Sequence, residues 1–221
     1  VSLAGIAEGS QMIAPDMGTM LCFLFTDTKL PARILQSCLK RAVDRSFNCI
    51  SVDDDTSTSD TVLMSATGQV KRQPRIDRAG DPALRDFRFA LEDMTRELAL
   101  MIAHDGAKSD RLLTCDVVGA ESSRSARNIR RSIVDSTLVR VGITGAEPRA
   151  GRIVMAVGKA GEKADRDRLG IAIGDVAIAE SGETVAGVDV DTVVRHLNSD
   201  QAQISADIGI GRGKARVWAA R

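Results

Sequence analysis

Residues 11–26 read QMIAPDMGTMLCFLFT, in which a turn-prone stretch passes at Thr19 into a largely apolar run. A short apolar run beside turn residues predicts a buried strand, here Thr19–Thr26. Immediately upstream, Gly5–Gly18 is rich in glycine, which predicts an irregular loop. By pattern alone, the junction of Gly18 and Thr19 is an ordinary entry from a loop into a strand.

Two long amphipathic helices are predicted downstream of this junction. Apolar residues recur every three or four positions from Pro31 to about Arg45, and again from Pro82 to Gly106. Asp81 is suited to cap the second helix, because its side chain can accept a main-chain N–H there. The remaining predicted elements are a helix from near Ser122, a helix over Val190–Leu197, and strands at Cys49–Val52, Thr61–Ser65 and Leu112–Val118.

The last third of the chain predicts two hairpins. One joins two short strands at Gly174-Asp175, and the other joins Ile204–Ile210 to Ala215–Ala219 through Gly211-Arg212-Gly213. Hairpins mixed with long amphipathic helices indicate an α+β fold of layered sheets with packed helices. The spacing does not indicate a doubly wound parallel sheet.

Composition excludes several classes of partner. Lysine plus arginine number 30, as do aspartate plus glutamate, and aromatic residues make up 3%, which argues against nucleic acid. No apolar stretch approaches the roughly 20 residues that span a bilayer, so no membrane association is predicted. The cysteines have no paired spacing, which predicts buried, reduced thiols in a cytoplasmic protein. They are Cys22, Cys38, Cys49 and Cys115.

No residue cluster indicates a metal or a cofactor. His104 and His196 are too scattered for a zinc site, and each is interpreted as a charge partner of a helix C-terminus. Adjacent carboxylates in Asp53–Asp55 point to alternate sides of an extended chain, so a polar loop is predicted. Gly209–Gly213 is similar to a phosphate loop only superficially, because no helix pattern follows it.

The strongest signal is a resemblance to the ornithine acetyltransferase family, also called bifunctional glutamate N-acetyltransferases (ArgJ). QMIAPDMGTM at residues 11–20 is similar to the family's GMIAPNMATM, the region of its self-cleavage. Four further segments resemble family motifs in the same order along the chain. They are Arg41–Thr61 (RAVDRSFNCISVDDDTSTSDT), Ala99–Arg111, Ile129–Gly158 and the final glycine-turn segment Ile204–Trp218.

The resemblance implies the ornithine acetyltransferase (DmpA/ArgJ-like) fold and a domain organisation. The family's precursor is about twice this length and cuts itself before a threonine, which falls between Gly18 and Thr19 here. Residues 1–18 would be the tail of the α segment, and residues 19–221 a β-chain-like acyltransferase domain that stops before the family's carboxy-terminal tail. The absence of an initiator methionine at Val1 likewise leads us to expect a fragment or a processed piece.

The implied chemistry makes Thr19 the nucleophile. A hydroxyl needs a base, and a freed α-amino group, with a pKa of about 8, can remove the proton from the hydroxyl of its own residue. The resemblance implies acetyl transfer from N-acetylornithine to glutamate in arginine biosynthesis, without a cofactor. It also implies a companion α chain and an α2β2 heterotetramer.

Some substrate positions depart from the family. Glu8 stands where the family has a substrate-contacting lysine, and Ala107 stands where it has a substrate-binding glutamate. The oxyanion-hole threonine and glycine belong to the family's first half. A catalytically impaired or structural member is therefore one alternative. A related self-cleaving amidohydrolase, in which water replaces the acceptor amine, is another.

Overall fold

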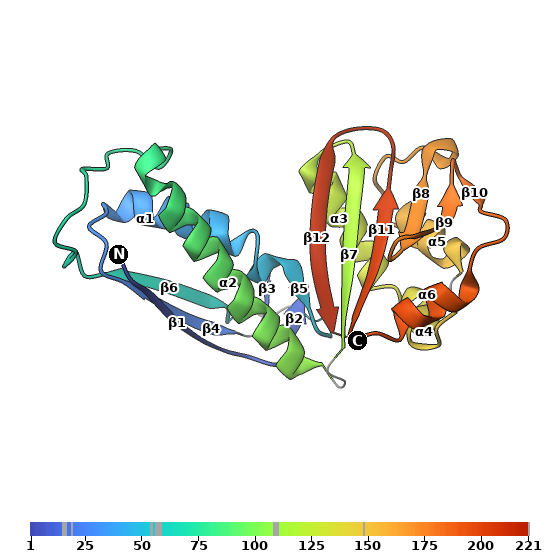
Figure 1. The fold of residues 1–221 in the computed structure, drawn as a ribbon, viewed down its shortest axis with the longest axis horizontal. Helices are drawn as coiled ribbons and strands as arrows, with labels where there is room; N and C mark the ends of the chain where they lie inside the picture. Colours follow the sequence, from blue (N-terminus) through green and yellow to red (C-terminus); the bar gives the residue numbers. More distant parts are fainter. Residues whose placement is uncertain are drawn as a thin grey trace. The chain divides into compact units, whose positions relative to one another are not determined.

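The computed structural model describes residues 1–14, 17–18, 20–53, 55, 59–107, 111–147 and 149–220. The chain forms two compact units, Val1–Gly106 and Ala107–Arg221. Each unit combines a β-sheet with packed helices, so the predicted α+β class is confirmed (Figure 1). No helix in the described ranges is long and apolar enough to cross a membrane.

The first unit is built on a sheet of three strands in the order β1-β4-β6. These are β1 (Leu3–Glu8), β4 (Leu21–Thr26) and β6 (Thr61–Ala66). The central strand β4 runs antiparallel to β1 and parallel to β6. The shorter elements are β2 (Ile13–Ala14), β3 (Met17–Gly18), β5 (Ile50–Ser51), η1 (Phe47–Cys49) and η2 (Pro82–Leu84).

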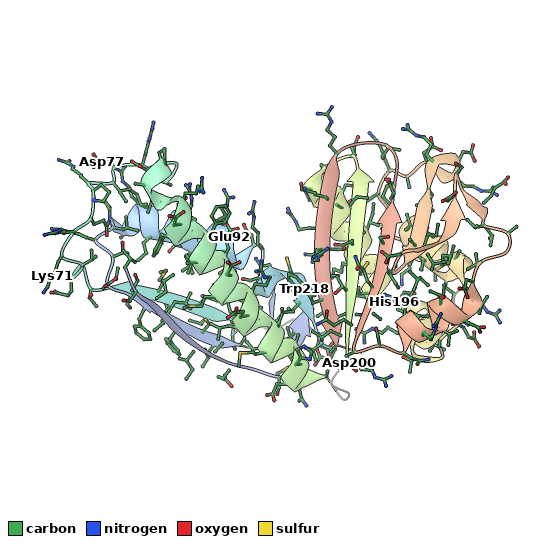
Figure 2. All side chains as sticks on the ribbon, viewed as in Figure 1. Lys71, Asp77, Glu92, His196, Asp200 and Trp218 are labelled. Atoms are coloured by element: carbon green, nitrogen blue, oxygen red, sulfur yellow. The ribbon has the colours of Figure 1, made fainter. Side chains whose placement is uncertain are left out.

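Helices α1 (Ala32–Val43) and α2 (Arg85–Gly106) cover one face of this sheet (Figure 1). The helices are joined through Glu92 of α2, which binds Arg41 and Arg45 at 2.8 Å each (Figure 2). The predicted start of the second helix is confirmed, because the Asp81 carboxylate accepts the N–H of Ala83 at 2.9 Å. A 3-10 turn, η2, precedes the α-helix there.

The loop predicted over Gly5–Gly18 was wrong in its first part, which forms β1. A β-carbon at Gly5 would lie 2.7 Å from Cδ2 of Leu24 and 3.0 Å from Cδ1 of Leu98. The ends of these two leucine side chains would have to shift to admit a β-carbon. Gly5 therefore lies where α2 approaches the sheet closely. The sequence pattern alone indicates a turn residue at this position, which is the more common role of glycine.

The second unit contains six strands in the order β10-β9-β8-β11-β7-β12. They are β7 (Leu112–Ala120), β8 (Gly170–Ile173), β9 (Val176–Glu180), β10 (Glu183–Thr184), β11 (Gln201–Asp207) and β12 (Gly213–Ala220). Helix α3 (Ser123–Val134) packs on β7 and β12, and α6 (Val190–Leu197) packs on β11 and β8. The other helices are α4 (Thr137–Thr144), α5 (Ala150–Lys159) and η3 (Arg166–Arg168).

The cysteines behave as the sequence predicts. All four are buried thiols outside any disulfide. Burial raises the pKa of the Cys22 thiol to about 11, and burial together with the Asp116 carboxylate raises the pKa of Cys115 to about 12. The thiols therefore act as small apolar core groups.

One of the two predicted hairpins is confirmed and the other is wrong. β8 and β9 pair about Gly174, whose φ is 57°. β11 and β12 do not pair, because β7 lies between them, parallel to β11 and antiparallel to β12. The connection crosses the end of β7, where the N–H groups of Ile210 and Gly211 donate to the Gly119 carbonyl at 2.9 and 2.7 Å.

The glycines of this connection are required by close backbone approach. A β-carbon at Gly213 would overlap the backbone of Ser122, and one at Gly211 would overlap the carbonyl of Ala120. Glycine is the residue that permits such an approach. The same pair of glycines also fits a hairpin turn, which is why the sequence pattern alone led to the wrong pairing.

We expect Gly213→Ala to destabilise the protein by about 1–3 kcal/mol or more, because the obstructing atoms are backbone atoms that cannot rotate away. The matched control is Gly151→Ala in α5, where a β-carbon meets nothing within 4 Å. That change should be neutral or slightly stabilising, since alanine favours helix. Urea unfolding measures both, and equal midpoints for the two variants would contradict the close approach at Gly213.

Candidate active site

Thr19 lies outside the described residues, as do Pro15 and Asp16, but both flanks of Thr19 are held in place. On one side, Gly18 ends β3 and pairs with Ile13 of β2. On the other side, the N–H of Thr61 donates to the Met20 carbonyl at 3.0 Å, just before β4 begins. The two residues that border Thr19 are therefore fixed by main-chain pairing from two different segments.

The β1–β4 ladder reaches across this junction. Every residue of Leu3–Glu8 pairs with a residue of Leu21–Thr26, from Leu3 opposite Thr26 to Glu8 opposite Leu21. The segment before Gly18 and the segment after Thr19 are thus hydrogen-bonded neighbours in one sheet. A break in the chain between them would leave this ladder in place.

Asp53 binds the backbone just before β2. Its carboxylate accepts the N–H of Met12 at 2.6 Å and the N–H of Ile13 at 3.0 Å. The neighbouring N–H of Val52 donates to the Ile13 carbonyl at 2.7 Å. Met12 has a φ of 53°, a left-handed conformation that costs a residue with a side chain about 1–2 kcal/mol. The carboxylate stabilises this bend. The bend directs the chain into the β2–β3 pair.

The sequence pattern assigned Asp53 to a polar loop and missed this contact. Its partners are 40 and 41 residues away, and no local signal connects them. Asp54, the middle acid of the run, lies outside the described residues. Within the described ranges, no group of three His, Cys, Asp or Glu side chains is placed to hold a metal ion.

Glu8 and the approach to Ala107 lie at the same end of the first unit as this junction. Glu8 is exposed and ends β1 opposite Leu21, two residues after Thr19. Gly106 ends α2 so close to Ser10 that a β-carbon would overlap the Ser10 carbonyl. Ala107 follows directly. The fold therefore brings the end of α2 next to Ser10, although the two are far apart in sequence.

His196 has a structural role in the second unit. Its Nε2 accepts the N–H of Gln203 at 2.9 Å, and its ring packs against Gly174 (Figure 2). The predicted position of His196 at a helix C-terminus is confirmed, because it lies in the last turn of α6, and its role as a charge partner stays a prediction.

A groove that the sequence did not reveal lies on the helix side of the first unit. It has a volume of about 370 Å³ and is lined by Ile13, Ala14 and Met20 together with Lys40 and Asp44 of α1. These residues come from segments without a common motif, so only the tertiary structure assembles them. One of the lining residues, Met20, directly follows Thr19 in the sequence.

The fold defines the class of protein. A crystal structure of the arginine biosynthesis bifunctional protein ArgJ from Bacillus halodurans matches it with a TM-score of 0.82 and 31% sequence identity. The match covers 90% of this chain and 92% of that chain. The chain thus has the α+β fold of an ArgJ protein.

Sequence comparison gives the family. The model of the ArgJ family matches residues 1–220, and the chain belongs to that family. The relative from Gluconobacter oxydans, an arginine biosynthesis bifunctional protein ArgJ, is 48% identical over 218 residues. The relative of the same name from Mesorhizobium japonicum is 46% identical over 220 residues. Each match covers 99% of this chain but only 51% and 53% of the relatives, so the chain spans about half their length.

We expect Asp53→Ala to release the bend at Met12. Hydrogen bonds to a charged acceptor contribute about 1.5–3 kcal/mol, which corresponds to a loss of amide hydrogen-exchange protection of about 10- to 100-fold at Met12 and Ile13. Asp55→Ala, which removes an exposed carboxylate two residues away, is the control. Unchanged protection in the Asp53 variant would show that the carboxylate does not hold the bend.

Proposed function

We propose that this chain is part of an acetyltransferase of arginine biosynthesis, which moves an acetyl group from N-acetylornithine to glutamate through Thr19. The observation that carries the proposal is the match to the ArgJ family over residues 1–220, within which Thr19 follows the family's cleavage motif. The relatives' shared name, arginine biosynthesis bifunctional protein ArgJ, supports the pathway.

The proposed maturation cuts the bond between Gly18 and Thr19. The Thr19 hydroxyl oxygen attacks the Gly18 carbonyl carbon, the C–N bond breaks, and the amine takes up the hydroxyl proton. Water then hydrolyses the ester, which leaves a carboxylate on Gly18 and a free α-amine on Thr19. The pairing of Gly18 with Ile13 and the hydrogen bond from Thr61 to the Met20 carbonyl support this step, because they hold the residues on either side of Thr19.

The lengths of the relatives support a two-chain product. Curated relatives are about twice as long as the region that this chain matches. In contrast, the match covers 92% of the chain in the crystal structure. A polypeptide cut in two accounts for both values. In this proposal residues 1–18 are the tail of the α segment and residues 19–221 the β chain, and the β1–β4 ladder keeps the pieces together.

In the proposed transfer, the Thr19 amine takes the proton of the Thr19 hydroxyl, and the oxygen attacks the acetyl carbon of N-acetylornithine. The amide C–N bond breaks and ornithine leaves with the proton on its amine. The amine of glutamate then attacks the acyl ester and restores the hydroxyl. No cofactor takes part in either half-reaction, because an acyl group moves between two amines through an oxygen ester.

Glu8 favours a second candidate, a catalytically impaired or structural family member. Its exposed carboxylate lies opposite Leu21, where the resemblance expects a lysine, and it repels a substrate that carries its own carboxylate. Ala107 removes a second expected contact, to the substrate's amino groups. A self-cleaving amidohydrolase is the remaining alternative. For the active form, we propose a cytoplasmic α2β2 assembly with the companion α chain.

Replacing the proposed nucleophile distinguishes the active enzyme from an impaired or structural family member. We expect Thr19→Ala to abolish both the cut and acetyl transfer, because alanine has no oxygen that can carry an acyl group. Thr19→Ser retains the hydroxyl and should keep both activities. Intact mass of the full-length protein reports the cut, and transfer from N-acetylornithine to glutamate reports the activity. Transfer by the alanine variant would refute the assignment of Thr19.

Restoring the family's charge at position 8 tests the effect of Glu8. We expect Glu8→Lys to lower the KM for glutamate by about tenfold or more, because repulsion of the substrate carboxylate becomes attraction. Glu97→Lys on the exposed surface of α2 makes the same change in net charge elsewhere. Equal KM values for the two variants would show that residue 8 does not face the substrate.

A further inference from the structure

The Asp53 carboxylate holds the segment that leads into the β2–β3 pair with both of its oxygens. One oxygen, Oδ2, accepts the N–H of Met12 at 2.6 Å, and the other, Oδ1, accepts the N–H of Ile13 at 3.0 Å. Each N–H thus has a carboxylate oxygen of its own. An asparagine could serve only one of them, because its amide nitrogen is a donor and would face the second N–H.

Ile13 connects this contact to the bond that is proposed to break. Its N–H is bound by Asp53, its carbonyl accepts the N–H of Val52 at 2.7 Å, and it is the register partner of Gly18. Its side chain is buried in the core, with 1% of the residue exposed. Ile13 is therefore held by both its main chain and its side chain, and Gly18 lies beside this fixed residue.

The carboxylate also stabilises a backbone conformation that the chain would otherwise leave. Met12 has a φ of 53°, in the left-handed region that favours glycine. The end of α2 adds a contact just upstream, where a β-carbon at Gly106 would overlap the Ser10 carbonyl. That contact involves a carbonyl, whereas Asp53 binds N–H groups. Loss of the carboxylate therefore lets Met12 leave the bend and lets Ile13 move with it.

We propose that Asp53 is a positioning residue for the self-cleavage and not for acetyl transfer. This inference rests on the proposed function. In that function the Thr19 hydroxyl oxygen attacks the Gly18 carbonyl carbon, the C–N bond breaks, the amine takes up the hydroxyl proton, and water hydrolyses the resulting ester. Asp53 acts on this step through Ile13, because the position of Ile13 sets the position of the Gly18 main chain.

The two reactions depend on different sides of Thr19. Cutting requires the Gly18 carbonyl and the hydroxyl to be held in a near-attack geometry. Transfer follows the release of Gly18, so it depends on the side of Thr19 that stays attached. The N–H of Thr61 holds that side through the Met20 carbonyl, and the β1–β4 ladder continues from there. Asp53 belongs to the side that is released.

The experiment follows the cutting of the full-length protein by intact mass after a pulse of cell-free synthesis. We expect Asp53→Asn to slow the appearance of the piece that begins at Thr19 by about 10- to 100-fold, since a misplacement of about 1 Å has an effect of that size. Asp27→Asn is the matched control. The Asp27 carboxylate accepts the N–H of Ser2 at 2.7 Å, at the opposite end of the β1–β4 ladder. This control should cut at the wild-type rate.

Two further measurements distinguish positioning from a general loss of structure. Adding Met12→Gly to the Asp53→Asn variant should raise its cutting rate by about fivefold or more, because glycine adopts the left-handed bend without a carboxylate. Acetyl transfer is measured after prolonged incubation and divided by the amount of cut protein. This transfer rate per cut molecule should be the same for Asp53→Asn and the wild type.

The inference is overturned by equal cutting rates for Asp53→Asn and Asp27→Asn, or by a transfer rate per cut molecule that falls together with cutting. A cutting rate that Met12→Gly does not raise would exclude the bend as the route of the effect and overturn it as well. Wild-type protein that is cut but transfers no acetyl group refutes the proposed transfer alone, and the cutting rates then decide the inference. Wild-type protein that stays uncut refutes both, since there is then no cut to position.

Discussion

The antiparallel ladder between β1 and β4 is the contact on which the rest of the first unit depends. It pairs the residues before the Gly18–Thr19 bond with the residues after it, register by register. Because the two strands are neighbours in one sheet, their hydrogen bonds do not require the chain between them to be continuous. In the proposed maturation, this ladder holds the new terminus in position after the covalent link is lost.

Glycines set the distances around this ladder. At Gly5 the absence of a side chain lets α2 approach the sheet, and at Gly106 it lets the end of α2 reach the Ser10 carbonyl. The contact at Gly106 is with backbone atoms, which cannot rotate away. The Asp53 carboxylate adds a polar constraint on Met12 from a third segment. Together they position the chain that enters the candidate site without any metal or disulfide among the described residues.

The same rigidity lets side chains vary on an unchanged scaffold. The register places whatever residue stands at position 8 opposite Leu21, so a substitution there leaves the ladder in place. Position 107 follows the end of α2 in the same way. The contacts of the ladder are made by backbone atoms, so side chains can vary without breaking them.

The sequence by itself determined what depends on contacts within a few residues. Helical periodicity, the capping of η2 by Asp81 and the β8–β9 hairpin at Gly174 were all predicted, and so was the family, through the motif around Thr19. Only the tertiary structure decided which strands pair and what the glycines are for. β7 separates β11 from β12, and Gly5 lies within a strand, because these arrangements depend on segments up to 100 residues away. Periodicity reports which side of an element is buried, but not against what, and that second question is settled by packing in three dimensions.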